Sequence, residues 1–440
     1  MLQTIRNAWK IEDLRKKILF TLLIVLLYRL GNAVPVPFIN VDLLKQHFET
    51  TNMQGTVFGL YNVMSGGAFS QATIFALSIQ PYINASIIIQ LLTIAIPALE
   101  RLQKEGGEEG RKKIASITRY STVVIGLIQG FAYFMMVKGY GLLNATGTAS
   151  IWAAIVIILT FTSGSALIMW LGEQITEFGI GNGISIILFV SIVARFPSSI
   201  ATQISNVANG SLQWWVLLLM YLGALLLMYL GALVLIVLIV LVNDAERRIP
   251  VQYSKRVVGR KMYGGQSTHL PMKVNMSGVL PIIFAQSIAS LPATICMFKA
   301  NWREGWLMTN VFNTDTWPYA VMYFLLIIFF SYFYSTIQFN PIEVANNLKK
   351  NGGFIPGFRA GKPTSDFIQK VLNKITLFGA IYLGIIAVTP IIIGAVSSAD
   401  TLTGISLGGT SIIIVVGVAL ETVRAIEAQM LMRNYKGFLN

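Results

Sequence analysis

The chain has 440 residues, of which 55% are hydrophobic and only 12% charged, and its net charge is +14. Soluble domains usually carry about 25% charged residues, so this composition argues against a water-soluble enzyme, and the hydrophobicity excludes a disordered chain. One cysteine, Cys296, excludes a disulfide framework and a cysteine-based zinc site, and two histidines, His47 and His269, leave little for histidine chemistry. The composition therefore predicts a multi-spanning α-helical membrane protein with a basic surplus.

Ten apolar segments are candidates for membrane-spanning helices, since about 20 apolar residues cross the bilayer core. Uniformly apolar runs of this length are not typical of barrel strands, which alternate. The first segment lacks a small-residue cleavage site, so we expect a retained anchor rather than a signal peptide. The fifth is the weakest, because it is short and begins with glycines. In chain order the segments are 18–34, 74–96, 118–137, 151–171, 180–196, 214–242, 278–298, 319–338, 372–396 and 405–425.

Basic residues are strongly biased to one side of this arrangement. Of the 33 lysines and arginines, 27 fall on the side of both termini and six on the other, and the two sides carry net charges of +13 and +1. Because basic residues accumulate in cytoplasmic connections, we expect both termini in the cytosol and an even number of spans.

The segments divide near residue 205 into two sets of five, 1–205 and 206–440. An odd number of spans gives the two halves opposite orientations, and inverted repeats of this kind place a transport pathway at their interface. This interpretation rests on topology, because the halves share no clear residue-level similarity. One local repeat is present: LLLMYLGA occurs at 217–224 and again at 225–232. We interpret it as a tandem duplication, natural or engineered, rather than as a functional motif.

Motifs for catalysis or cofactor binding are weak. GIGNG at 179–183 and GFRAGKPT at 357–364 resemble phosphate-binding loops, but they lack the strand context or the spacing that such loops need. Glu173 and Glu177 are more typical of a solvated helix end than of a catalytic carboxylate pair. Ionisable residues deep in the spans are almost absent, which weakens a proton- or ion-coupled carrier. We therefore predict no catalytic residues, no metal and no cofactor.

Two long cytosolic connections, about 243–273 and 339–374, mix basic and apolar residues and are candidate docking surfaces. Positive-inside topology with contacts to anionic lipids explains the same charge, and so does binding to RNA such as a ribosome surface. On the outer side, small residues interrupt the apolar stretch 60–78. Irregular backbone at membrane depth survives only inside protein or in a cavity, so this stretch is a re-entrant segment or a simple outer loop.

An ordered set of motifs runs along nearly the whole chain. It comprises RLGNAVPVPFIN, SIQPYINASIIIQLL, WLGEQITEFGIGNGISII, RRIPVQYSKR, STHLPMKVNMSGVLPIIFAQSI, FNPIEVANNLKKNGGFIPGFRAGKPT and LGGTSIII. This set resembles the bacterial SecY family, the central subunits of protein-conducting translocation channels. The resemblance implies an all-α membrane protein whose ten transmembrane helices form two inverted, pseudo-symmetric halves, closed like a clamshell around an hourglass pore.

The resemblance also implies where the pore lies and how it is closed. A short segment, about 60–75, is expected to be the plug that closes the pore from outside, and its glycines are expected to let it swing away. A ring of branched apolar side chains yields to a passing chain yet blocks ions by dewetting. One ring position, Leu188, departs from the usual isoleucine. The implied ring is Ile83, Ile87, Ile184, Leu188, Ile283 and Ile414, and the implied plug centre is Ser65, Gly66, Gly67, Ala68 and Phe69.

By the same resemblance, the second, third, seventh and eighth spans form a lateral gate, through which signal sequences and membrane segments leave for the lipid. The two basic loops resemble the docking site for the SecA motor or the ribosome. Arg359 matches a functionally critical loop arginine of the family, and an arginine makes forked contacts that a lysine does not. The candidate docking residues are Arg247, Arg248, Lys255, Arg256, Arg260, Lys349, Lys350 and Arg359.

The resemblance thus predicts a channel subunit rather than an enzyme. It is expected to pass unfolded secretory polypeptides across the bacterial plasma (inner) membrane and to release transmembrane segments sideways. Its expected partners are the SecE and SecG subunits, SecA, the ribosome, signal peptides, nascent polypeptides and anionic lipids, but not DNA. A secondary transporter of a small solute is the alternative.

Overall fold

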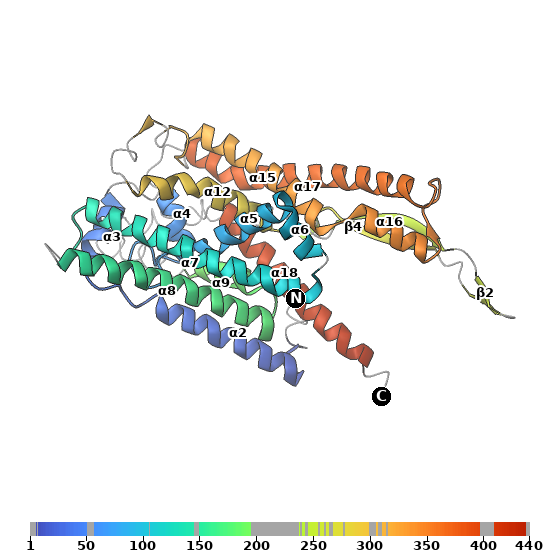
Figure 1. Ribbon diagram of the computed structural model, residues 1–440, viewed down its shortest axis with the longest axis horizontal. Helices are drawn as coiled ribbons and strands as arrows, with labels where there is room; N and C mark the ends of the chain where they lie inside the picture. The colour runs from blue at the N-terminus through green and yellow to red at the C-terminus, as the bar shows by residue number, and fades with distance from the viewer. Residues whose placement is uncertain are drawn as a thin grey trace, which may run out of the picture.

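The computed structural model describes a largely helical chain with a small sheet at one end (Figure 1). The LLLMYLGA repeat and nearly all of the sixth apolar segment lie outside the described residues. The described residues are 6, 8–50, 57–104, 106–144, 149–194, 237, 240–242, 245–253, 256–258, 261–263, 267–275, 278–298, 305–306, 310–313, 316–396 and 409–436.

The helices before residue 200 include long apolar helices and short connecting helices. They are α2 (Glu12–Gly31), α3 (Val41–Thr50), α4 (Val57–Met64), α5 (Gln80–Ala95), α6 (Pro97–Lys104), α7 (Gly107–Gly139), α8 (Ala149–Phe178) and α9 (Gly183–Val193). The later helices are α12 (Leu280–Cys296), α15 (Trp317–Gln338), α16 (Pro341–Lys350), α17 (Lys362–Val396) and α18 (Gly409–Lys436).

Within the described residues, four helices are long and apolar enough to cross a membrane, and they lie in α7, α8, α15 and α17. The pair α5 and α6 makes a fifth if it is counted as one span, although it bends by 104° at its break. α9 and α12 are apolar but shorter. The chain is therefore a multi-pass membrane protein, and the number of ten spans stays a prediction.

The second span is more irregular than the sequence predicts. Its helix begins at Gln80 rather than at residue 74, because Ser78 has a positive φ of 51° and residues 65–79 form turns. The helix ends before Ile96, whose backbone is extended. A residue that precedes a proline is pushed out of the helical region, and Pro97 follows. α6 then leaves in a new direction.

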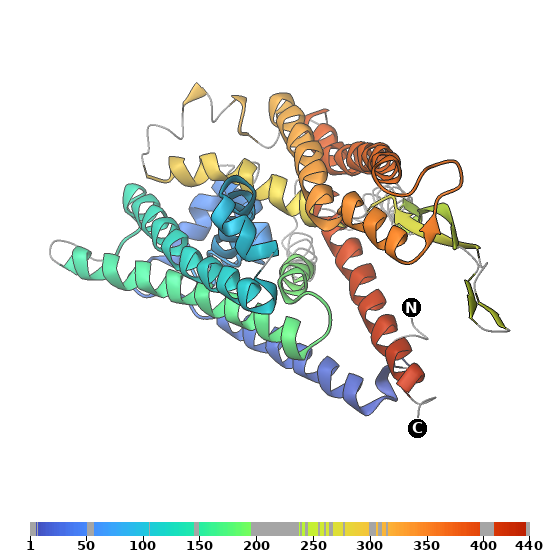
Figure 2. The same cartoon turned by 45° about the vertical axis from the view of Figure 1, so that its right-hand side comes forward.

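The helices pack as two groups that meet at a few contacts. α7 packs against α5 and α8, and α2 packs against α8. In the later part of the chain, α15 packs against α12 and α17, and α17 packs against α18. Figure 2 shows α2, α7 and α8 side by side, away from α15 and α17. The two groups meet where α12 contacts α4, α5 and α7, and where α18 contacts α9.

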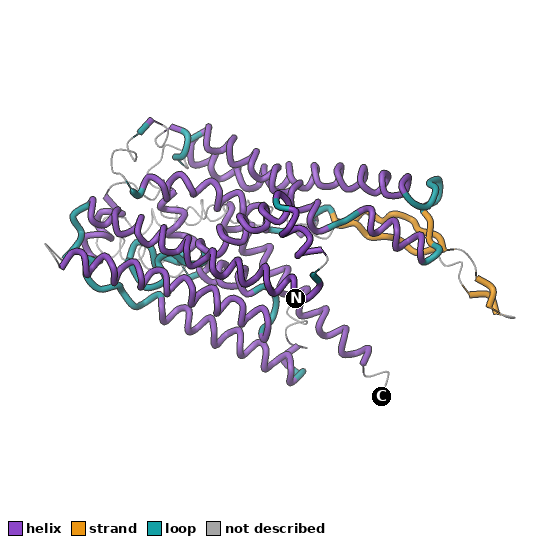
Figure 3. The backbone as a smooth tube through the Cα atoms, in the orientation of Figure 1, coloured by secondary structure: helices purple, strands orange, loops and turns teal. Residues whose placement is uncertain are grey.

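The two basic connections, predicted as separate loops, build one small folded platform. β1 (Glu246–Tyr253) pairs antiparallel with both β4 (Ser267–Lys273) and β5 (Gly353–Phe354), so strands from the two connections share a sheet. β2 (Arg256–Val258) and β3 (Lys261–Tyr263) form a separate hairpin beyond it. Figure 3 shows all these strands at one end of the molecule.

Alternation of apolar and polar residues explains why RRIPVQY becomes a strand. Ile249 and Val251 are buried, whereas the residues beside them are exposed, as expected when successive side chains point to opposite faces. These two side chains form an apolar cluster with residues from β4, α16, the turn after β5, and α17: Met272, Leu348, Ile355, Ile368 and Leu372. The all-helical prediction missed this sheet, although the alternation was visible in the sequence.

Candidate functional site

The six predicted ring residues lie in one apolar cluster at the centre of the helices. Five of them are buried, with at most 3% of each side chain exposed, and Ile184 is partly buried against the same cluster. They come from four helices: α5 supplies two, α9 supplies two, and α12 and α18 supply one each. All six predicted residues therefore belong to the same large apolar cluster: Ile83, Ile87, Ile184, Leu188, Ile283 and Ile414.

A tight turn between α8 and α9 positions the two ring residues of α9. Asn182 caps α9, because its side-chain oxygen accepts hydrogen bonds from the backbone N–H groups of Ile184 (3.0 Å) and Ser185 (3.4 Å). Gly183 lies directly against the backbone of Gly172 on α8, where any larger residue would clash. Gly183 of the GIGNG motif therefore serves the packing of α9 on α8.

The predicted plug segment is folded inside the protein rather than exposed as an outer loop. Residues 65–79 form turns, and Ser65, Phe69 and Ala72 are fully or almost fully buried. Gly66 and Gly67 have positive φ values of 68° and 93°, which glycine adopts without strain. This geometry agrees with the re-entrant alternative, because irregular backbone needs protein around it.

Hydrogen bonds fix the plug segment at both ends. The Ser65 hydroxyl donates to the Asn62 carbonyl oxygen (3.2 Å) and accepts from the Phe69 N–H (3.0 Å). Beyond the turns, the Ser78 hydroxyl donates to the Met64 carbonyl oxygen (3.2 Å). The segment after α2 adds a bond from the Val36 N–H to the Ala72 carbonyl oxygen (2.9 Å). The plug segment thus has a defined backbone conformation that these hydrogen bonds hold in place.

The contact between α12 and the earlier helices contains buried polar groups. The Ser287 hydroxyl donates to the side-chain oxygen of Gln80 on α5 (3.3 Å). Further amide groups on the three contacting helices are buried, and their side chains have atoms without a hydrogen-bond partner: Asn84 on α5, Gln129 on α7 and Gln286 on α12. Gln80 lies in this contact and its amide nitrogen has no partner, so the contact is less stable than an apolar one of equal area.

The platform carries the predicted docking residues that the structure describes. Arg247 and Arg248 are exposed on β1, and Lys349 and Lys350 are exposed at the end of α16. Arg256 lies in β2, whereas Lys255 and Arg260 fall outside the described residues. The structure therefore places basic residues from both connections on one platform, which the sequence did not predict.

Arg359 lies on an exposed turn of this platform. Its carbonyl oxygen accepts a hydrogen bond from the Thr364 hydroxyl (2.7 Å), near the start of α17. The neighbouring Phe358 stacks on Phe367 with ring centroids 4.2 Å apart. Gly357 and Gly361 flank the turn with φ values of 88° and 110°. These contacts hold the backbone while the guanidinium side chain is exposed, an arrangement suited to meeting a partner.

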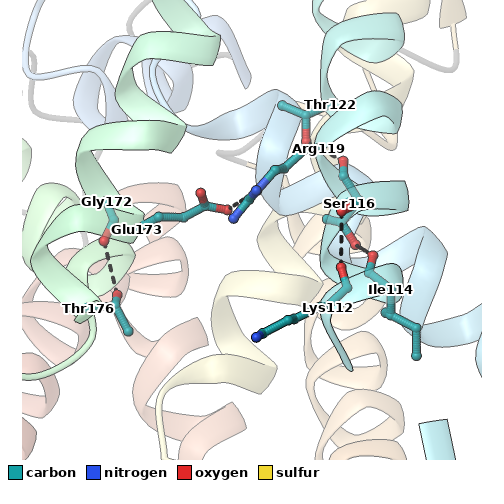
Figure 4. A network of polar contacts seen from close by, with 9 residues as sticks. Lys112, Ile114, Ser116, Arg119, Thr122, Gly172, Glu173 and Thr176 are labelled. Carbon is teal, nitrogen blue, oxygen red and sulfur yellow. Dashed lines mark hydrogen bonds and ion pairs between the residues drawn. The ribbon is translucent and has the colours of Figure 1, made fainter. Parts of the chain in front are cut away.

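Glu173, which the sequence suggested to lie at a solvated helix end, forms an ion pair. The Nε of Arg119 on α7 donates to Oε1 of Glu173 on α8 at 2.9 Å, and Figure 4 shows the two side chains pointing toward each other. Glu173 lies near the end of α8, whereas Arg119 lies inside α7, and the charge count assigns both to the cytosolic side. The described residues contain no group of three or more His, Cys, Asp or Glu that could hold a metal ion.

Comparisons with known proteins agree on a single family. A sequence model of the SecY family matches residues 73–423. The protein translocase subunit SecY of Streptomyces coelicolor is 44% identical over 451 aligned residues, and the alignment covers 100% of both chains. The chain belongs to the SecY family. Nothing in the comparisons supports the alternative of a small-solute transporter.

Solved structures confirm the fold of this SecY-family chain. One is a structure of the SecY protein from work on how its plug domain stabilises the closed state of the channel. It matches with a TM-score of 0.61 at 17% sequence identity, and the match covers 95% of this chain and 92% of the SecY chain. Another, the channel in the canine ribosome–channel complex from the endoplasmic reticulum, has a TM-score of 0.58 at 15% identity and covers 95% and 93%. At such identities the likeness shows the clamshell fold alone.

Proposed function

We propose that the chain is the protein-conducting subunit of a translocation channel, which passes unfolded secretory polypeptides across the membrane and releases transmembrane segments sideways. One observation carries this proposal: six apolar side chains from four helices share one apolar cluster, and Met64 and Phe75 at the two ends of the plug segment belong to the same cluster. A dry constriction of this kind blocks ions by dewetting. Because its side chains are apolar, it also makes no specific demand on the sequence of a passing chain.

The lateral gate is proposed to lie between α12 and α15 on one side and α5 and α7 on the other. The Ser287–Gln80 hydrogen bond supports this position, and so do buried amide atoms without a partner on the same helices: the amide nitrogen of Gln80, both atoms of Asn84 and Gln129, and the oxygen of Gln286. Hydrogen bonds between membrane helices are worth only about 1 kcal/mol, so such a contact opens at modest cost. A signal sequence that inserts here would replace the contact with its own apolar side chains.

Partner docking is proposed for the basic platform. Exposed arginines and lysines from both connections fit acidic or phosphate-bearing surfaces, which suits SecA, a ribosome and anionic lipids. SecA or the ribosome would supply the energy, so the chain itself is not proposed to be an enzyme or to bind a cofactor. SecE and SecG are the proposed companion subunits, and signal peptides and nascent polypeptides the proposed cargo.

The proposed location is the bacterial plasma membrane, with both termini in the cytosol. The bias of 27 basic residues to one side against six on the other supports this orientation. It also places the platform on the side where SecA and ribosomes act.

Reconstitution tests the proposed function directly. The chain with SecE and SecG in proteoliposomes should import a secretory precursor when SecA and ATP are added, and the precursor should become resistant to external protease. Omitting ATP or removing the signal sequence are the controls. Vesicles that bind SecA but never protect a precursor, with correctly folded channel present, would contradict the proposal.

A further inference from the structure

Phe69 in the plug segment is enclosed by aromatic rings from three helices. It is fully buried, and its ring lies 5.7 Å from Phe48 of α3, 6.4 Å from Phe58 and 5.8 Å from Tyr61 of α4, and 4.9 Å from Tyr133 of α7. The Tyr133 hydroxyl also donates to the backbone carbonyl oxygen of Phe69 (2.7 Å). We call the four aromatic residues that surround Phe69 the aromatic cage.

One member of the cage is bonded to the proposed gate. The Tyr61 hydroxyl lies 2.7 Å from the Thr294 hydroxyl of α12, and both side chains are buried. Thr294 and Ser287 are seven positions apart, so they lie on the same face of α12. The face that holds α5 through Ser287 thus also holds α4 through Thr294. Tyr61 therefore contacts the plug with its ring and the gate helix with its hydroxyl.

We propose that Tyr61 and Thr294 form a latch that couples the gate to the plug, an inference that rests on the proposed function. While α12 packs against α4 and α5, the latch fixes the Tyr61 ring and keeps the cage closed around Phe69. When α12 moves away, the Tyr61 hydroxyl loses its hydrogen bonds to Thr294 and Ser290, both on α12, in a buried site. The Tyr61 ring is then free to change its position, and one wall of the cage loosens.

The latch makes opening sequential: displacement of α12 comes first, and release of the plug follows. This order seals the pore until a segment has entered the gate. Gly66 and Gly67 supply a backbone that can follow once Phe69 is released, because their positive φ values show a conformation that other residues adopt only with strain. The bond from Tyr133 to Phe69 lies on α7 and is independent of the latch.

Plug displacement can be measured without any transport assay. The chain has a single cysteine, Cys296, so Cys296→Ser with Ala68→Cys leaves one thiol, at a plug position that is only 2% exposed. Its reaction rate with a membrane-impermeant maleimide reports how often the plug opens in resting proteoliposomes of the full chain with SecE and SecG. Tyr61→Phe and Thr294→Val remove the two hydroxyls while keeping ring and volume.

Each single substitution should raise the labelling rate about fivefold, since a buried hydrogen bond changes an equilibrium by about that factor. The double variant should be no faster than the faster single variant, because both remove the same bond. Thr376→Val is the matched control, as its hydroxyl pairs with Ser335 (2.9 Å) within the later group of helices, and it should leave the rate unchanged.

Unchanged rates in both single variants, additive rates in the double variant, or an equal rise with Thr376→Val would overturn the latch. If Tyr61→Phe prevents assembly, the double variant Thr294→Val with Ser290→Ala decides, because it removes both hydroxyls of α12 that bond to Tyr61. The import assay on the unsubstituted chain judges the proposed channel function separately, so failure of the latch and failure of that function are distinguishable.

Discussion

Ser287 of α12 donates a hydrogen bond to the side-chain oxygen of Gln80 on α5, and the bond of 3.3 Å is buried between the two groups of helices. The Gln80 amide nitrogen lacks a protein partner, as do both amide atoms of Asn84 one turn further along. Amides left unpaired in a buried contact favour its opening, because water or a new partner satisfies them in the open state. The contact between α5 and α12 is thus closed, and only a small free energy holds it closed.

Asn84→Leu should therefore make the proposed gate harder to open. Leucine has similar volume and leaves no unpaired polar atom, so the closed state should gain about 1–3 kcal/mol. Precursor import should slow by about tenfold, and precursors with weakly apolar signal sequences should suffer most. Ile88→Leu, at a position 41% exposed on the same helix, is the control and should import normally. Faster import by the Asn84 variant would show that the amides hold the gate closed.

Ile283→Asn should weaken the closed pore. The side chain is 3% exposed within the ring cluster, and a buried amide without a partner costs about 1–3 kcal/mol. Asparagine also wets the constriction, so resting ion flux across planar bilayers should rise by about tenfold or more. Export of precursors with defective signal sequences should rise with it. Ile283→Leu keeps an apolar side chain of equal volume and should keep the seal; equal flux through both variants would place Ile283 outside the barrier.

Arg359→Glu should abolish most motor-driven import without destabilising the fold. The residue is exposed on its turn, so the melting temperature should change little, whereas a reversed charge opposes an acidic partner. SecA affinity and ATP-dependent import are the two measurements, and a loss of about tenfold is expected in import. Arg359→Lys separates charge from geometry, because it retains the charge but loses the forked guanidinium. Normal import by Arg359→Glu would remove this residue from the docking site.

Four of the proposed ring residues follow local motifs on regular helices, which the sequence shows. Ile83 and Ile87 lie one turn apart on α5, and Ile184 and Leu188 repeat this spacing on α9, so each pair shares a face. Their convergence with Ile283 and Ile414 depends on packing between helices distant in the chain, and composition alone does not encode it. The family resemblance supplied that part of the prediction.

The aromatic cage and the shared sheet of the platform could not be predicted from the sequence, because both also depend on contacts between residues far apart in the chain. Tyr61 and Thr294 are separated by more than 200 positions, and no local pattern pairs one buried hydroxyl with another at that distance. The Arg119–Glu173 pair likewise joins two helices, at positions 54 residues apart in the chain. Register between β1 and β5 is set by a tertiary contact, so the sequence offered the strand alternation of RRIPVQY but not its partner.

Met272→Ala should unfold both parts of the platform together. Met272 is fully buried on β4, in the cluster that joins Ile249 of β1 to Leu348 of α16, and truncating a buried methionine costs about 2–5 kcal/mol. Limited proteolysis should then cut within 243–273 and within 339–374 at similar rates, and SecA binding should weaken. His269→Ala removes an exposed side chain of the same strand and should leave both segments protected. Cleavage confined to 243–273 would mean that the two connections fold independently, and that docking does not depend on their shared core.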